Sequence, residues 1–143
     1  MILSAQQIFS DDQVITANAD STNVIDLGVA GTPFGAVAAL NNDKGKGNKI
    51  PILIQVTEAF NTLTSLEIKI SAGATTALGT TVISKVVPLA DLVLGYQFPV
   101  EVLPNEITER YLGIEYVVAG TPPTLGKVTA GITMGNQTNV TGA

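Results

Sequence analysis

The feature that most constrains this chain is a two-residue alternation of apolar and polar side chains. It occurs in short segments separated by glycine, proline, asparagine and aspartate, and it is clearest in LEIKI, residues 66–70. A period of two is typical of a β-strand with one buried face. Only LADLVLG, residues 89–95, indicates a helical turn. Segments with strand character are predicted at 22–28, 50–57, 66–70, 81–87, 96–102, 110–118 and 127–134.

About seven short strands with this punctuation predict an all-β fold, either a sandwich or a barrel. A chain of 143 residues is expected to form one domain, residues 1–143, around a single core. Residues 1–13 show no clear strand pattern and are expected to form an extended N-terminal arm. Residues 28–49 are expected to form a long loop, and residues 135–143 a C-terminal tail.

The composition indicates that the protein works in an assembly. Charged residues make up 13% of the chain, against about 25% in an average domain, whereas hydrophobic residues make up 45%. Apolar side chains that exceed the capacity of a small core tend to lie at interfaces. A monomer rich in alanine, valine and threonine is the alternative reading of the same numbers.

The residue types exclude most enzyme chemistry. Without histidine or cysteine, Ser-His-Asp, Cys-His and His-metal sites are impossible. The carboxylate pairs Asp11 with Asp12, Glu106 with Glu109, and Glu67 with Glu115 are interpreted as turn and surface groups rather than as a glycosidase pair. We therefore expect no catalytic residues, no cofactor, no metal and no enzyme activity.

The charges also argue against nucleic-acid and membrane partners. Seven lysines and arginines are scattered among twelve carboxylates, without a basic stripe. No apolar stretch approaches the length of about 18–20 residues that a membrane span needs. The N-terminus lacks the cationic and hydrophobic regions of a signal peptide, so we expect synthesis in the cytoplasm.

Two charged features remain open. In DKGKGNK, residues 43–49, the three lysines Lys44, Lys46 and Lys49 are either solvated or face an acidic partner surface. Arg110, the one arginine, is expected to form a structural ion pair with Glu106 or Glu109, the carboxylates closest to it in sequence. A contact with a neighbouring subunit is the alternative.

Taken in order, several stretches resemble the jelly-roll capsid cement, or decoration, proteins of tailed double-stranded DNA phages. The most specific part is ERYLGIEYVVAGT followed by GKVTAGIT, at residues 109–121 and 126–133. The other parts are STNVIDLG (21–28), IPILIQVTEAF (50–60), TSLEIKISAG (64–73) and VPLADLVLGYQFPVEVLP (87–104).

The resemblance implies a jelly-roll-type antiparallel β-sandwich that binds the outer capsid surface of the virion and bridges major capsid proteins. It also implies small homo-oligomers and no catalytic residues. As candidate contacts with capsid or sister subunits we select apolar residues of the arm, one aromatic residue and the lysines of the loop: Ile2, Leu3, Ile8, Phe9, Phe34, Lys44, Lys46 and Lys49. A fibre or carbohydrate-binding β-module is the main alternative, and a β-domain outside any virion is another.

Overall fold

The computed structural model describes residues 2–40, 47, 49–105 and 107–135. In these residues the secondary structure consists of strands and one short 3-10 helix, and no helix is long and apolar enough to cross a membrane. The elements are β1 (Leu3–Val14), β2 (Ala19–Asp20), β3 (Ile25–Asp26), β4 (Ile52–Glu58), β5 (Leu63–Gly73), β6 (Thr80–Pro88), η1 (Leu89–Asp91), β7 (Tyr111–Gly120) and β8 (Lys127–Thr133).

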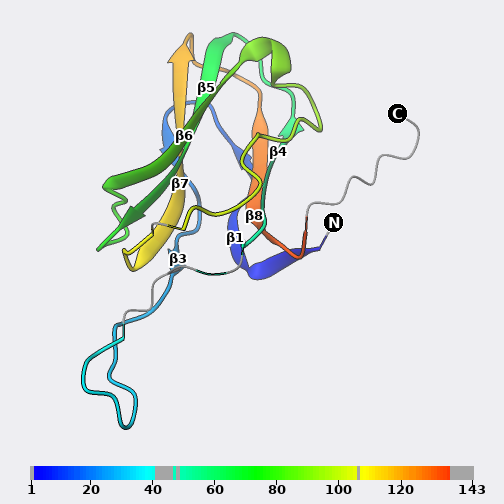
Figure 1. Ribbon diagram of the computed structural model, residues 1–143. Helices are drawn as coiled ribbons and strands as arrows, with labels where there is room; N and C mark the ends of the chain where they lie inside the picture. Colours follow the sequence, from blue (N-terminus) through cyan, green and yellow to red (C-terminus); the bar gives the residue numbers. More distant parts are fainter. Residues whose placement is uncertain (1, 41–46, 48, 106, 136–143) are drawn as a thin grey trace.

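The strands form two antiparallel sheets packed as a β-sandwich (Figure 1), so the predicted fold class is confirmed. One sheet has the order β1-β8-β4, and segment 96–103 continues it beside β4. In the other sheet, β2 and β3 both pair with β7, which is followed by β5 and β6. The first strand therefore pairs with the last, and the second with the second-to-last, as in a long hairpin rolled into a jelly roll.

Residues 96–102 were predicted as a strand, but the pairing of segment 96–103 with β4 is interrupted. Isolated bridges join Gln55 to Gln97 and Pro51 to Val102. Between them, the N–H of Val100 donates to the carbonyl of Phe98 over 2.7 Å in a tight turn. Pro99 lies at the centre of this turn, and because proline has no N–H it cannot continue a ladder. The segment keeps its place in the sheet without regular strand geometry.

One hydrophobic core fills the space between the sheets. Alternate residues of β5 and β7 face it, as the sequence predicts: Leu66, Ile68 and Ile70 from β5, and Leu112, Ile114 and Tyr116 from β7. Ile52, Ile54 and Val56 of β4 oppose them from the other sheet. Burial of such side chains contributes about 1.5–3 kcal/mol each, so this alternation is the main source of stability.

The predicted N-terminal arm is wrong for residues 3–13, which belong to β1 and pair with β8. The pairing register shifts three times along β1, which marks bulges, and Asp12 has a positive φ of 48°. A bulge changes which face the following side chains occupy. Phe9 and Ser10 are consequently both buried although they are neighbours. The bulges removed the alternation that would have revealed a strand.

A chain of hydrogen bonds between side chains, partly buried, links the two sheets. The hydroxyls of Tyr116 and Ser10 are 2.8 Å apart, and Ser10 donates to Oε1 of Gln13 over 2.6 Å. Since a serine hydroxyl has one proton, Tyr116 is the donor to Ser10. Burial raises the pKa of Tyr116, which keeps the phenol protonated. These hydrogen bonds let β1 approach β7 without leaving a buried hydroxyl unpaired.

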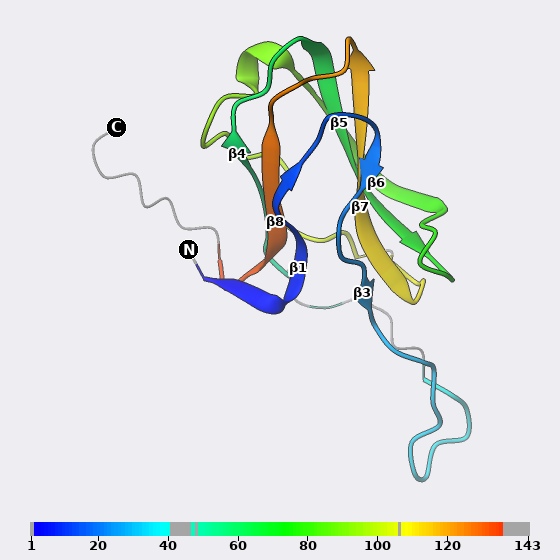
Figure 2. The same ribbon diagram turned by 180° about the vertical axis from the view of Figure 1, so that it is seen from behind.

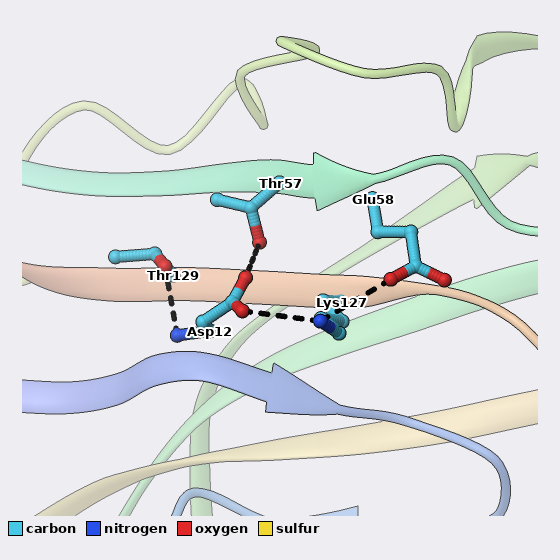
Figure 3. A network of polar contacts seen from close by, with 5 residues as sticks. All are labelled: Asp12, Thr57, Glu58, Lys127 and Thr129. Atoms are coloured by element: carbon cyan, nitrogen blue, oxygen red, sulfur yellow. Dashed lines mark hydrogen bonds and ion pairs between the residues drawn. The ribbon is translucent and has the colours of Figure 1, made fainter.

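On the outer face of the first sheet, Asp12 ties β1 to β8 and β4 (Figure 3). Its carboxylate accepts a hydrogen bond from the Thr57 hydroxyl over 2.6 Å and forms an ion pair with Lys127 over 3.2 Å. Its backbone N–H donates a hydrogen bond to the Thr129 hydroxyl. Lys127 also reaches Glu58 over 3.3 Å. The hydrogen bond from Thr57, followed by that from Lys127, lowers the pKa of Asp12. Of the two adjacent aspartates, Asp12 thus has a structural role, because it connects three strands of the first sheet.

Candidate interaction surface

The long loop predicted at 28–49 contains a hairpin that projects from one end of the sandwich. Both views show it extending beyond β3, away from the two sheets (Figures 1 and 2). Gly31 and Leu40 close it through two backbone hydrogen bonds of 2.8 and 3.2 Å. We call residues 29–40 the hairpin. The sequence from Leu27 to Asn42 contains no charged residue.

The tip of the hairpin is an ordered turn that exposes apolar side chains. The N–H of Ala36 donates to the carbonyl of Pro33 over 3.0 Å, and Gly35 has a φ of +83°. A glycine with positive φ at the third position is the requirement of a type II turn. Phe34 therefore occupies the corner, and both Phe34 and Val37 are fully exposed to solvent.

Arg110 holds the root of the hairpin. Its Nε and Nη2 atoms each donate to a carboxylate oxygen of Asp26 over 2.6 Å, which is a bidentate ion pair. The same carboxylate accepts the N–H of Gly28 over 2.8 Å, and the N–H of Leu27 donates to the Arg110 carbonyl. The guanidinium carbon also lies 4.9 Å from the centre of the Tyr111 ring. These contacts fix the chain where it leaves the sheet.

The predicted structural ion pair of Arg110 is thus confirmed in kind, but its partner among the described residues differs from the one expected. Its partner is Asp26 of β3 rather than Glu109, and Glu106 lies outside the described residues. The reason is the antiparallel pairing of β3 with β7, which places Asp26 opposite Tyr111. A residue 84 positions away in sequence cannot be identified from local spacing.

The electrostatics of this pair favour its charged form. The hydrogen bonds from Arg110, followed by the one from Gly28, lower the pKa of Asp26 from 3.8 to about 2. The carboxylate therefore stays ionised at any pH above about 3, and the ion pair persists throughout the neutral range. Both side chains remain more than a third exposed, so we regard the pair as a geometric constraint rather than a large source of stability.

A second group of exposed apolar residues lies at the opposite end of the sandwich, where η1 and the turn between β7 and β8 meet (Figure 1). It consists of Val93, Leu94 and Leu125, which we call the distal residues. Residues 60–61 connect their segments: Phe60 donates its N–H to the Leu92 carbonyl, and Asn61 accepts the N–H of Leu125.

The candidate contact residues predicted from the sequence differ in their exposure to solvent. Phe34, Ile2 and Lys49 are exposed, and the Ile2 carbonyl accepts the N–H of exposed Met134. Leu3 and Ile8 are half-buried in β1. Phe9 is a correction, because it is fully buried in the core and unavailable to a partner. Lys44 and Lys46, and the tail from 136 onward, lie outside the described residues.

Sequence reasoning missed Asp26, Val37 and the distal residues. For Val37 a signal existed, because the uncharged run of residues 27–42 is unusually long for a solvent-exposed loop. Asp26 and the distal residues carried no local signal, since their roles depend on strands and turns that meet only in the folded chain.

Comparison with known proteins identifies a protein family whose model matches this chain. A family model described as Bbp16 matches residues 9–132, which is most of the chain and includes every strand except the first residues of β1 and the last residue of β8. No curated protein matches the sequence.

Proposed function

Because this chain belongs to the Bbp16 family of phage proteins, we propose that it is a non-enzymatic capsid cement protein. In this proposal it binds the outer surface of the capsid and bridges neighbouring major capsid proteins in the virion. It acts as a small homo-oligomer, without direct contact with nucleic acid or membrane.

The observation that carries the proposal is the placement of exposed apolar side chains at both ends of a rigid sandwich. The hairpin presents Phe34 and Val37 at one end, and the distal residues lie at the other. Soluble monomers rarely gather such side chains on projecting elements unless a partner covers them. A protein that bridges two neighbours needs two separated contact surfaces, and this arrangement supplies them.

The physical mechanism is multivalent binding to the assembled state. A copy that contacts two capsid subunits at once binds the intact shell and not the separated subunits. Ligands that bind only one state stabilise that state by mass action, and a second contact on the same rigid body forms at high effective concentration. Weak individual contacts can therefore stabilise a shell without covalent crosslinks.

The experiment is quantitative mass spectrometry of purified particles, which compares the copy number of this chain with that of the major capsid protein. We expect a near-stoichiometric ratio, and particles lacking the protein should break at lower temperature until the purified protein is added back. A handful of copies per particle would instead support the fibre alternative. Absence from particles would refute any virion role.

A further inference from the structure

We propose that the hairpin is the primary anchor of this protein, that Phe34 and Val37 enter an apolar pocket on a capsid subunit, and that Arg110 is the positioning residue for this anchor. The inference rests on the proposed function and adds the gripping element, the chemistry of its partner and the role of the lone arginine.

The hairpin is already ordered before it binds a partner. The type II turn at 33–36, the Gly31–Leu40 closure and the Arg110–Asp26 pair constrain the hairpin at its tip, middle and root. Binding then loses little conformational freedom, and preorganisation of this kind favours tight association. A loop without a partner would gain nothing from holding Phe34 in water.

The side chains at the tip of the hairpin are of the type that anchors an interface. Aromatic side chains at the centre of an interface dominate binding when they fill a desolvated pocket. Phe34 is fully exposed at the corner of the turn, and Val37 is fully exposed three residues later. Because residues 27–42 carry no charge, the tip can be desolvated without burying an ionised group.

A second copy of this chain is a less suitable partner at the two hollows described for it. The larger hollow, of about 470 Å³, is lined by apolar residues such as Leu53 and Phe98 but also by Glu101. The other, of about 330 Å³, is lined by Asp20 and Glu115 among others. A phenyl ring in either hollow would lie beside a carboxylate, which favours an apolar pocket on another polypeptide.

A lipid surface is also a poor match. Membrane-binding segments combine apolar residues with lysine or arginine, which anionic lipids attract. The hairpin has no cation, and the whole chain has a net charge of −5. We therefore assign the hairpin to a protein pocket.

The role of Arg110 follows from the contacts at the root. The guanidinium fixes Asp26, and Asp26 fixes Gly28, the last residue before the hairpin. Without the guanidinium the hairpin would remain closed, because the Gly31–Leu40 bonds do not involve it. Its direction relative to the sandwich would no longer be set, so Phe34 and the distal residues could not engage their partners together.

The test uses the full-length protein and capsid shells stripped of it, with affinity measured by titration. We expect Phe34→Ala to bind roughly ten- to a hundredfold more weakly, as expected for a buried phenyl ring. Val86→Ala is the matched control, because Val86 is an exposed apolar residue of β6, and it should bind as the wild type does. Neither variant should change the melting temperature by more than a few degrees.

Arg110→Met tests the positioning role through non-additivity. If Arg110 acts by placing Phe34, Arg110→Met should weaken binding alone but add little once Phe34→Ala is present. Fully additive losses would show that Arg110 contributes independently of the hairpin and would refute this part of the inference.

The outcomes separate the inference from the proposed function. If the wild type binds shells and Phe34→Ala binds them with the same affinity, the hairpin is not the anchor, but the cement function stands. If the wild type does not bind shells, both proposals are refuted. Vesicles of phosphatidylethanolamine and phosphatidylglycerol that bind wild type but not Phe34→Ala would overturn the assignment in favour of lipid. Loss of self-association in Phe34→Ala would overturn it in favour of a second copy.

Discussion

At the scale of single residues, the most informative side chain is Arg110, because its planar fork matches the geometry of a carboxylate. The pair with Asp26 is held by two hydrogen bonds of 2.6 Å, and the stacking on Tyr111 orients the guanidinium. Lysine could supply the charge but not the two parallel bonds. Arg110 therefore fixes the geometry of the chain at the point where it leaves the sheet.

The first prediction concerns the pH dependence of this pair. The pKa of Asp26 is lower in the folded state, about 2, than its ordinary value of 3.8. A lowered carboxyl pKa stabilises the fold above pH 3.8, and the contribution disappears as the pH falls from 3.8 towards 2. We expect the difference in unfolding free energy between wild type and Asp26→Asn to be constant from pH 5 to 8 and to shrink below about pH 4.

Chemical denaturation at each pH measures this difference, and a two-dimensional NMR titration of the Asp26 carboxyl gives the pKa directly. Asp11→Asn is a suitable control, because Asp11 is an exposed aspartate on β1, in the other sheet from β3 and β7. A pKa of Asp26 near 3.8 would show that the ion pair does not persist in solution.

The second prediction concerns Gly126, where the backbone requires glycine for two reasons. Its φ is +135°, and an added Cβ would overlap the ring of Phe60. We expect Gly126→Ala to lower the unfolding free energy by about 1–3 kcal/mol. Gly31→Ala is the matched control, since no atom lies within 4 Å of its added Cβ. Equal stability of the two variants would contradict the close packing of Phe60 on this turn.

At the scale of elements, β6 shows how the sandwich protects an open edge. It is the last strand of its sheet, so one side of its backbone has no neighbouring strand in the described structure. Lys85 pairs in register with Ile68, whose side chain faces the core, and therefore lies on the core side of the edge strand. An inward-facing charge of this kind discourages a second strand from adding to the edge.

The third prediction is that Lys85→Val promotes self-association through β6. The variant would leave the segment 82–87 of this edge strand without a charge, and this segment includes the exposed Val86, which favours strand addition. We expect larger species in light scattering at concentrations where the wild type stays uniform. Lys69→Val is the control, because Lys69 lies on the central strand β5. No difference between the two variants would show that the edge is protected by other means.

The strand pattern was predictable to different degrees along the chain. Regular strands such as β4, β5, β7 and β8 were recovered because each buries one continuous face. β1 was missed because its bulges break the alternation, and residues 96–102 were predicted as a strand although Pro99 interrupts the pairing of this segment. Departures from period two are invisible in sequence when a partner strand far away in the chain compensates for them.

At the scale of the whole molecule, the rolled-up topology makes the two sheets depend on each other. β1 and β8, from opposite ends of the described chain, pair with each other, and the Tyr116–Ser10 hydrogen bond joins one sheet to the other. One continuous core contains residues from both sheets. Contacts between distant segments must form before the core closes, and such folds generally fold in milliseconds to seconds.

The fourth prediction is that residues 1–143 unfold as one cooperative unit. Far-ultraviolet circular dichroism and tyrosine fluorescence, to which the buried Tyr116 contributes, should report the same midpoint on heating. Replacing residues 30–39 by a short glycine-serine turn should leave this midpoint nearly unchanged, because the hairpin lies outside the core. Two separate transitions would show that the sheets fold independently.

The sequence by itself determined the all-β class, most of the strand segments and the residues that form the core, because burial of alternate side chains is a local pattern. Only the tertiary structure decided that Arg110 pairs with Asp26, that Phe9 is internal and that Phe34 and Val37 project into solvent. Each of these depends on which strands become neighbours, and antiparallel pairing joins residues that are far apart in the chain. The spacing of residues along the sequence does not indicate such pairs, so they can be identified only in the folded structure.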